Sequence, residues 1–136
     1  MQDSFRKCEK RMRALRAILL ITFTLLTSSA YSASKTMLVL GDSLSAEYGL
    51  VRGTGWVPLL QKRLHEEKID ADIINASISG ETTSGGKAPL PELLAKHRPA
   101  IVVIELAAND ALRGLSRVAT EANLRAIITE AKKSKA

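Results

Sequence analysis

The stretch Lys35-Thr-Met-Leu-Val-Leu-Gly-Asp-Ser43 decides the fold, because an apolar run stops there at a glycine followed by two polar residues. A short apolar run of this kind predicts a buried strand over residues 35–40. Two similar runs follow over residues 71–75 and 100–106. The last is apolar on both faces from Ile101 to Ile104, which is typical of a strand covered by helices on both sides.

Three further segments carry apolar residues at the three- and four-residue spacing of a helix. They cover residues 56–64, 90–97 and 120–131. The third is expected to begin at Thr120 as its N-cap. Its expected apolar face consists of Leu124, Ile127, Ile128 and Ala131. Alternating strands and helices predict right-handed crossovers, and therefore a parallel sheet in an α/β fold.

Three loops follow the carboxyl ends of these strands, where parallel α/β sheets bind their ligands. They contain Ser43, Gly80 and Asn109. A serine that enters a helical turn directly after a strand exposes its hydroxyl and leaves its own N–H unpaired. A glycine lets a backbone N–H approach a ligand closely, and an asparagine offers an amide donor. One nucleophile with three convergent donors suits acyl transfer through a tetrahedral intermediate.

Composition and charge exclude several other classes of protein. The 136 residues are 46% hydrophobic and 25% charged, which excludes a disordered or fibrous chain and fits one domain. The single cysteine, Cys8, excludes a disulfide scaffold and a cysteine-based zinc site, and no cofactor is expected. Most of the net charge of +6 lies in residues 1–34, with six Lys/Arg against two Asp/Glu. No nucleic-acid partner is expected, because the remainder carries no basic stripe and few aromatic residues.

Residues 1–33 have the three-part order of a secretory signal peptide. A positive stretch precedes the uncharged run Ala17–Thr27, and small residues follow it. These eleven residues are too few to span a bilayer, which needs about 20. Cleavage is expected after Ala30 or Ala33, which gives a periplasmic or secreted chain without a stable membrane span. An uncleaved anchor is the alternative, and Met12 is a second candidate for the start.

The three loops resemble the sequence blocks of the GDSL-type (SGNH) hydrolases. Gly41-Asp-Ser-Leu44 is similar to their first block, Ser77-Ile-Ser-Gly-Glu-Thr82 to their glycine block, and Asn109-Asp110 to the end of their G-x-N-D block. The flanking residues resemble the exported acyl-thioesterase, lysophospholipase and arylesterase branch, over about residues 36–130. This resemblance implies that residues 34–136 are the N-terminal part of a three-layer α/β/α flavodoxin-like sandwich.

The resemblance also implies roles for individual residues. Ser43 is expected to be the catalytic nucleophile, and its N–H, the Gly80 N–H and the Asn109 amide are expected to hold the oxyanion. Asp42 and Asp110 are expected to brace the loops. The implied substrate is a small acyl ester or thioester. The implied activity is that of an arylesterase, an acyl-CoA thioesterase or a lysophospholipase, acting through an acyl-enzyme.

The chain departs from the family pattern at two points. Ala107 stands where the family has glycine. If that position needs a positive φ, alanine costs about 1 kcal/mol, whereas a negative φ makes the exchange nearly harmless. The Asp-x-x-His block that holds the family's catalytic acid and base is absent from the sequence. His65 and His97 lie on helices that run toward the amino ends of the strands, so neither is expected to serve Ser43, and activity is expected to be impaired.

The last predicted strand has the composition of a central strand, yet no further strand follows it. We therefore expect a chain that is truncated at its carboxyl end, without the last strands of the sheet, or that is completed by another polypeptide. The uncovered edge of this third strand is expected to favour aggregation or pairing.

Two other functions remain open. A non-catalytic remnant, or an acyl- or glycan-binding fragment, would keep the three loops without turnover, and Ser43 would then serve only as a helix N-cap. The segment Gly80–Lys87 is close to a phosphate-binding P-loop. It has one surplus residue before the lysine, and Ala88 stands where a hydroxyl would hold Mg²⁺. Nucleotide binding is therefore the less favoured of the two.

Overall fold

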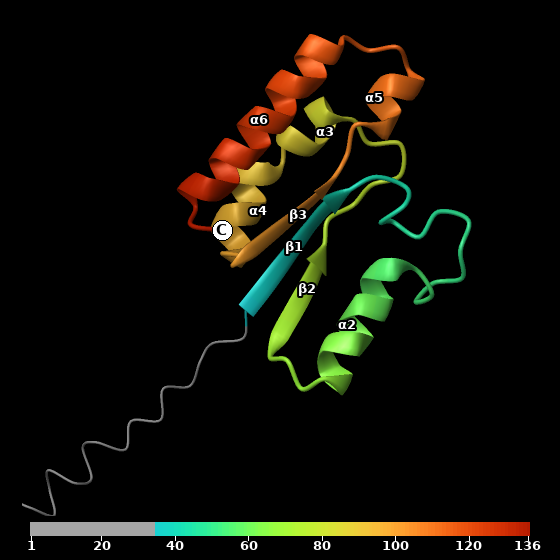
Figure 1. Cartoon of the computed structure of the whole chain (residues 1–136), viewed down its shortest axis with the longest axis vertical. Coiled ribbons are helices and arrows are strands. Elements are labelled where there is room, and N and C mark those ends of the chain that lie inside the picture. The colour runs from blue at the N-terminus through green and yellow to red at the C-terminus, as the bar shows by residue number, and fades with distance from the viewer. Residues whose placement is uncertain (1–34) are drawn as a thin grey trace, which may run out of the picture. The chain divides into compact units, whose positions relative to one another are not determined.

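The structure, a computed structural model, describes residues 35–136 (Figure 1). These residues belong to one compact unit. The predicted signal peptide over residues 1–33, with its cleavage points after Ala30 or Ala33, lies outside the described residues. None of the described helices is long and apolar enough to cross a membrane.

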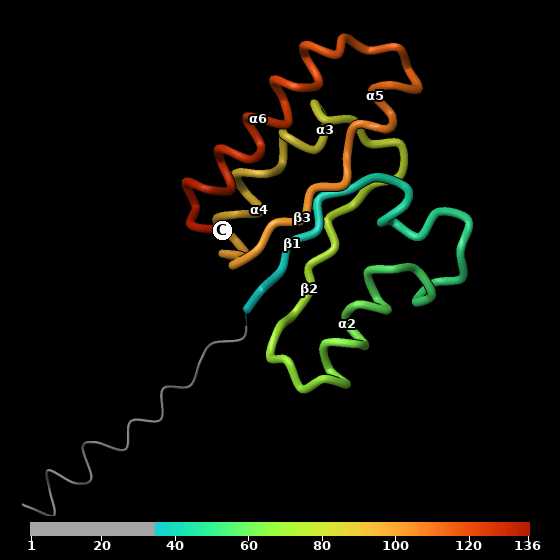
Figure 2. Tube along the Cα trace, viewed as in Figure 1, coloured from blue at the N-terminus to red at the C-terminus, as the bar shows by residue number. Residues whose placement is uncertain are grey.

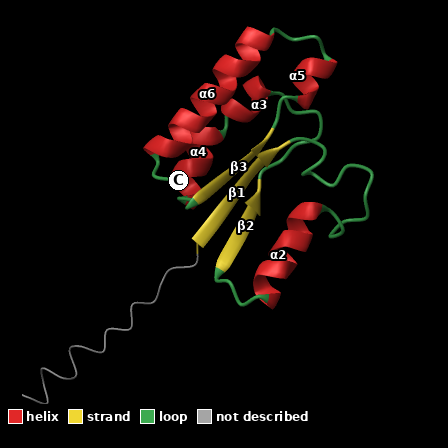
Figure 3. Ribbon diagram, in the orientation of Figure 1, coloured by secondary structure: helices red, strands yellow, loops and turns green. Residues whose placement is uncertain are grey.

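The centre of the fold is a parallel sheet of three strands (Figure 3). The strands are β1 (Lys35–Gly41), β2 (Ala71–Asn75) and β3 (Ile101–Glu105), in the order β2-β1-β3. In this register Leu38 of β1 faces Ile74 on one side and Val102 on the other. The predicted α/β fold with a parallel sheet is confirmed, and the strand order is the flavodoxin-like one.

Helices cover both faces of the sheet. α2 (Trp56–Glu66) connects β1 to β2 and lies on one side, whereas α4 (Leu90–His97) and α6 (Arg117–Lys133) lie on the other (Figure 1). The alternation of side chains along β1 explains this division. Leu38 and Leu40 point toward α4 and α6, and the buried Val39 between them points toward the opposite face.

The core lies between the sheet and the two helices α4 and α6. Five buried side chains form it: Leu38, Leu40, Leu90, Leu94 and Ile127. Each side chain of this size stabilises the fold by about 1.5–3 kcal/mol when it is fully removed from water. The core therefore fixes the direction of β1, and with it the place where the chain leaves the sheet at Asp42.

The last helix differs from its prediction at its start and on one face. α6 begins at Arg117, and its N-cap is Ser116, whose hydroxyl accepts a hydrogen bond from the Ala119 N–H. Thr120 lies inside the helix, where its hydroxyl oxygen is 3.1 Å from the Ser116 carbonyl oxygen. Ile127 is buried as expected, but Ile128 is 43% exposed because it lies at the border of the apolar stripe.

Two short helices at the carboxyl end of the sheet were not predicted. They are α3 (Thr83–Lys87) and α5 (Ala108–Leu112), and Figure 2 shows how the chain turns through both. α3 contains two glycines, which are poor helix formers. Gly86 is required by packing, because a Cβ at this position would lie 2.5 Å from Leu106 Cδ1. Close packing of α3 on the end of β3 thus overrides helix propensity.

Candidate active site

The chain turns sharply where it leaves β1, and this turn presents Ser43. The Ala46 N–H donates to the Asp42 carbonyl oxygen at 2.9 Å, and the Tyr48 N–H donates to the Ser43 carbonyl oxygen at 3.1 Å. Ser43 therefore lies in a turn and does not cap a regular helix. Within residues 35–136, no group forms a hydrogen bond with its Oγ or its N–H. The hydroxyl is therefore free to attack, and the N–H is free to donate.

Asp42 braces this turn, as predicted. Its side chain is only 1% exposed. One carboxylate oxygen accepts from the Leu44 N–H at 3.0 Å, and the other accepts from Asn109 Nδ2 at 3.1 Å. A buried carboxylate needs such donors, because it has left water. Asp42 thus ties the Ser43 turn to the loop that follows β3.

Gly80 lies in a tight turn after β2. The Glu81 N–H donates to the Ile78 carbonyl oxygen at 3.1 Å, and Gly80 has a φ of +81°. This is the third position of a type II turn, which favours glycine. Arg113 donates to the Gly80 carbonyl oxygen at 2.6 Å. The Gly80 N–H has no hydrogen-bond partner among the described residues, so it is a second free donor.

Asn109 joins the other two loops. Its Nδ2 lies 3.1 Å from Asp42 Oδ2 and 3.0 Å from the Glu81 carbonyl oxygen. These partners are the immediate neighbours of Ser43 and Gly80 in the sequence, so the structure brings the three predicted site residues to one place. Both N–H bonds of the amide have acceptors. Asn109 therefore donates to a ligand only if one of these two bonds is exchanged.

The helix that carries Asn109 starts from a strained residue. Ala107, the N-cap residue of α5, has φ +105° and ψ −16°. Residues that have a Cβ rarely adopt this backbone conformation, and it costs an alanine of order 1–3 kcal/mol. The structure therefore selects the costly alternative left open by the sequence. The position needs a positive φ, and this chain places a Cβ there.

Asp110 is the buried hub below Asn109, and it confirms the bracing role predicted for this residue. Its carboxylate accepts hydrogen bonds from the Thr83 N–H at 2.8 Å, from the Thr83 hydroxyl, and from the Thr120 hydroxyl at 3.1 Å. Burial acts to raise the pKa of Asp110. The hydrogen bonds from Thr83 and Thr120 outweigh it and hold the pKa below its ordinary value of 3.8. Asp110 thus joins α5 to α3 and α6 as a carboxylate.

Sequence reasoning missed a second polar network, centred on Glu105 at the end of β3. Glu105 Oε2 accepts from the Asp42 N–H at 3.3 Å and from the Ser45 hydroxyl at 3.0 Å. Trp56 Nε1 donates to the same Ser45 oxygen at 3.1 Å. The only signal in the sequence was an acid that ends an otherwise apolar strand.

Within residues 35–136, no hydrogen bond joins either histidine to Ser43. His65 is exposed on α2 and lies 3.1 Å from the Gln61 side chain, and His97 ends α4. His65 comes shortly before β2 in the chain and His97 shortly before β3, so both lie toward the amino ends of these strands, as predicted. The described residues therefore supply no histidine base for Ser43. They also contain no group of three metal-ligating side chains.

The segment that resembles a P-loop does not form a phosphate cradle. It folds into α3, whose N-cap Thr82 accepts from the Gly85 N–H. Lys87 Nζ donates to Asn123 Oδ1 of α6 at 2.6 Å, so the lysine is directed to a neighbouring helix. Lys87, the residue that would contact a phosphate in the nucleotide-binding interpretation, therefore has another partner.

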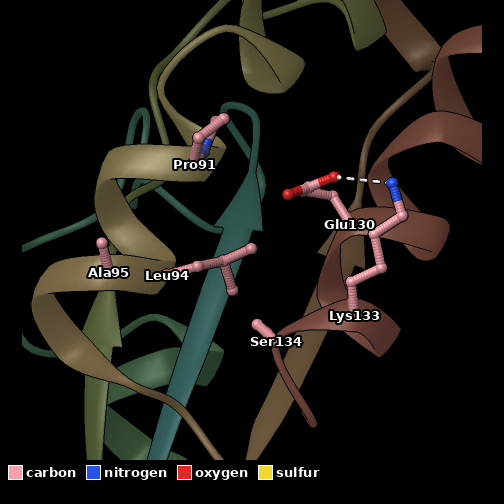
Figure 4. Close-up of a pocket in the computed structure, with 6 residues that line it drawn as sticks. All are labelled: Pro91, Leu94, Ala95, Glu130, Lys133 and Ser134. Carbon is pink, nitrogen blue, oxygen red and sulfur yellow. Dashed lines mark ion pairs between the residues drawn. The ribbon is translucent and has the colours of Figure 1, made fainter.

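A pocket of about 280 Å³ lies between α4 and α6 (Figure 4). Its lining residues are Pro91, Leu94, Ala95, Glu130, Lys133 and Ser134. Glu130 and Lys133 form an ion pair of 3.7 Å beside it. The pocket contains no residue of the Ser43, Gly80 or Asn109 loops, so it is separate from the candidate site.

The chain is similar to several known proteins. Residues 39–136 match the GDSL-like Lipase/Acylhydrolase family. The chain is 50% identical to Esterase TesA of Pseudomonas aeruginosa over 121 residues, which cover 89% of this chain and 59% of the relative. It is 46% identical to an Arylesterase of Vibrio mimicus over 120 residues, which cover 88% of this chain and 60% of the relative. The Escherichia coli protein named Thioesterase 1/protease 1/lysophospholipase L1 is 40% identical over 114 residues, covering 84% of this chain and 53% of the relative.

Solved structures of esterases are also similar to this chain. A crystal structure of TesA superposes with a TM-score of 0.74 at 51% identity, covering 75% of this chain and 57% of that one. The psychrotrophic esterase EstA from Pseudoalteromonas sp., inhibited by monoethylphosphonate, gives 0.72 at 46% identity, covering 75% and 56%. The chain thus spans a little over half the length of the relatives that it matches.

Proposed function

Because this chain belongs to the GDSL-like Lipase/Acylhydrolase family, we propose that it carries the nucleophile and the oxyanion donors of a serine ester or thioester hydrolase. The observation that carries this proposal is the position of Asn109. Its amide lies within 3.1 Å of groups beside both Ser43 and Gly80, so three separate loops meet at one place. A single helix N-cap serine would require neither of the other two loops.

The proposed reaction begins with attack by Ser43 Oγ on the acyl carbon. The carbonyl oxygen becomes an oxyanion, which the Ser43 and Gly80 N–H groups and the Asn109 amide stabilise. The bond to the leaving alcohol or thiol then breaks, and that group takes up the proton lost by Ser43. Water hydrolyses the acyl-enzyme and releases the acid. A base has to relay these protons, and the described residues do not contain a histidine that reaches Ser43.

Exposed apolar side chains on the same three loops support an acyl or aryl substrate. Leu44 follows Ser43 directly, Ile78 precedes Gly80 by two residues, and Leu112 follows Asn109 by three. All three are more than half exposed. Apolar side chains gathered at a site indicate contact with an apolar ligand group. The names of the relatives suggest aryl esters, acyl thioesters or lysophospholipids as substrates.

We also propose that the chain is exported and works in the periplasm or outside the cell. The proposal rests on the order of charged, apolar and small residues before position 34. The test is N-terminal sequencing of the protein recovered from the periplasm or medium. A mature chain that begins at Tyr31 or Ser34 is expected, and an intact N-terminus in the membrane fraction would overturn it.

The test of the hydrolase function follows the acyl group. The chain is incubated with p-nitrophenyl acetate, and acetylated peptides are measured by mass spectrometry. Acetyl-Ser43 is expected to form first and to persist, because no histidine of the described residues reaches it to promote its hydrolysis. Ser43→Ala abolishes this signal, whereas Ser84→Ala, at an exposed serine on α3, serves as the matched control.

Turnover is measured on the chain joined to the carboxyl-terminal part of the TesA relative that the match does not cover. Rapid hydrolysis of p-nitrophenyl butyrate, abolished by Ser43→Ala, is expected. Ser84→Ala in the same fusion is the matched control and is expected to keep the full rate. Equal acetylation of Ser43 and Ser84 in the chain alone would refute the proposed nucleophile.

A further inference from the structure

We infer that Glu105 is a positioning residue for acyl transfer, which holds the Ser43 turn so that the Oγ and N–H of Ser43 stay aimed at the substrate. The inference rests on the proposed function. It concerns a residue that does not touch the substrate and that acts through the neighbours of the nucleophile.

One carboxylate oxygen holds the turn on both sides of Ser43. Glu105 Oε2 accepts from the backbone N–H of Asp42, the residue before the nucleophile, at 3.3 Å. It also accepts from the hydroxyl of Ser45, two residues after the nucleophile, at 3.0 Å. Hydrogen bonds to an ionised acceptor are stronger than neutral ones. The backbone of Ser43 is therefore restrained from both directions while its own polar groups stay free.

The position of Glu105 in the sheet explains this contact. Glu105 is the last residue of β3, and its register partner is Gly41, the last residue of β1. The acid therefore stands beside the point where β1 ends and the Ser43 turn begins. Any apolar residue at position 105 would leave the Asp42 N–H without its acceptor.

Ser45 passes the restraint to two further elements. It is 1% exposed, and its Oγ also accepts from Trp56 Nε1 at 3.1 Å. Its carbonyl oxygen accepts from Asn75 Nδ2 at 2.8 Å, at the end of β2. The turn is thus held from α2, β2 and β3. Burial and these bonds also remove Ser45 itself as a nucleophile.

Packing leaves the turn little room to shift. A Cβ added to Gly41 would lie 2.7 Å from Ser45 Oγ and 2.9 Å from Ser77 Oγ, so these two hydroxyls already pack closely against the backbone of Gly41. A movement of about 1 Å at a reacting atom costs as much as 100-fold in rate. Loss of Glu105 is therefore expected to lower the reactivity of Ser43 well before it unfolds the chain.

The experiment compares Glu105→Ala and Glu105→Gln with Gln61→Ala in the 136-residue chain. Gln61 is the matched control, because its side chain also makes two hydrogen bonds to the backbone, at 2.7 and 3.1 Å, but at the amino end of β2. The rate of Ser43 acetylation by p-nitrophenyl acetate is the first readout. Fluorescence of Trp56, the only tryptophan, is the second, and thermal unfolding checks that each variant is folded.

Glu105→Ala is expected to slow acetylation by about 10- to 100-fold and to change the Trp56 emission. Glu105→Gln keeps one oxygen that can accept both bonds, so a smaller loss of about 2- to 10-fold is expected. Gln61→Ala lowers the unfolding temperature but leaves the acetylation rate within about twofold. If Glu105→Ala does not fold, Glu105→Gln decides, and its unchanged rate overturns the inference.

Two other results would also overturn the inference. Unchanged acetylation in folded Glu105→Ala refutes it while leaving the hydrolase proposal intact. An equal slowing in Gln61→Ala shows that only general stability is at stake. Absence of Ser43 acetylation in the unsubstituted chain refutes the proposed function itself, and with it a role for Glu105 in acyl transfer.

Discussion

The turn that presents Ser43 and the turn that presents Asn109 are built in opposite ways. Residues 42–46 have no positive φ, whereas Glu47, near the end of the Ser43 turn, has a φ of +59°, and hydrogen bonds from three elements hold the turn. The Asn109 turn begins at Ala107 with a φ of +105°. Ser43 keeps its polar groups free, whereas both N–H bonds of the Asn109 amide already have acceptors.

This difference separates the two halves of the proposed chemistry. The nucleophile is preorganised, because no hydrogen bond to another described residue has to break before Ser43 Oγ attacks or the Ser43 N–H donates. The third oxyanion donor is not, because Asn109 has to exchange a partner that it holds at 3.0 or 3.1 Å. Electrostatic stabilisation is greatest when the donors need no rearrangement during the reaction. The Asn109 side is therefore where substitutions are expected to raise as well as lower function.

The largest expected loss follows from Asp110→Asn, which breaks the hub of the Asn109 side. Asparagine offers one acceptor oxygen and an NH₂ group, so one of the two buried donors of Thr83 loses its partner. An unpaired buried donor costs about 1–3 kcal/mol. Urea unfolding is expected to show a loss of about 2–3 kcal/mol. Glu121→Gln, which breaks an exposed ion pair on α6, is the control and stays within about 0.5 kcal/mol.

The effect of Asp110→Asn is expected to depend on pH. The pKa of Asp110 is held below 3.8 in the folded chain, so the folded state favours the charged form. Its contribution to stability is therefore fully present above the pKa of the unfolded chain and is lost as the pH falls through the folded value. Unfolding is measured for both chains from about pH 7 to below about pH 4. A stability difference that does not shrink in acid would contradict this role for the charge.

The next largest loss is expected on the Ser43 side, from Gly41→Ala. The added Cβ would lie 2.7 Å from Ser45 Oγ and 2.8 Å from Ser45 Cβ, so the turn has to shift. Overpacking of this kind costs about 1–3 kcal/mol. We expect about 2 kcal/mol in urea unfolding, with a change in Trp56 emission because Trp56 bonds Ser45. Gly49→Ala probes a glycine with open space around it and φ +76°, so it separates backbone strain from crowding.

The sequence predicted the sheet and its long helices because their apolar residues follow simple periods. The runs at 35–40, 71–75 and 100–106 became β1, β2 and β3 with small changes at the ends. The strand ends in turn located the loops of Ser43, Gly80 and Asn109. Asp42 and Asp110 were predicted to brace the loops from their motif positions alone, and their hydrogen bonds to neighbouring loops and helices agree.

The remainder depends on contacts that no local pattern contains. α3 and α5 each have five residues, too short to show a helical period, and α3 includes two glycines. Thr120 and Ser116 are both suitable N-caps, and the bond from Thr120 to Asp110 exists only in the folded chain. The role of Glu105 depends on the β1–β3 register, which brings together residues about sixty positions apart.

The smallest expected effect is a gain of stability, from Ala107→Gly. Glycine accepts a φ of +105° without the steric cost of a Cβ, although it also raises the entropy of the unfolded chain. The net result is expected to be about 1 kcal/mol of added stability in urea unfolding. Ala108→Gly is the matched control, because Ala108 is the first helical residue of α5 and glycine there costs up to about 1 kcal/mol.

The two substitutions therefore differ in sign although they are adjacent and chemically identical. Ala107→Gly also removes the backbone strain before α5, so α5 can shift slightly. Asn109 is then expected to exchange one of its two hydrogen-bond partners at a lower cost. Faster Ser43 acetylation in Ala107→Gly than in the unsubstituted chain is the expected sign of this change. If both glycine substitutions destabilise the chain equally, the strain at Ala107 is not what distinguishes the Asn109 turn from the Ser43 turn.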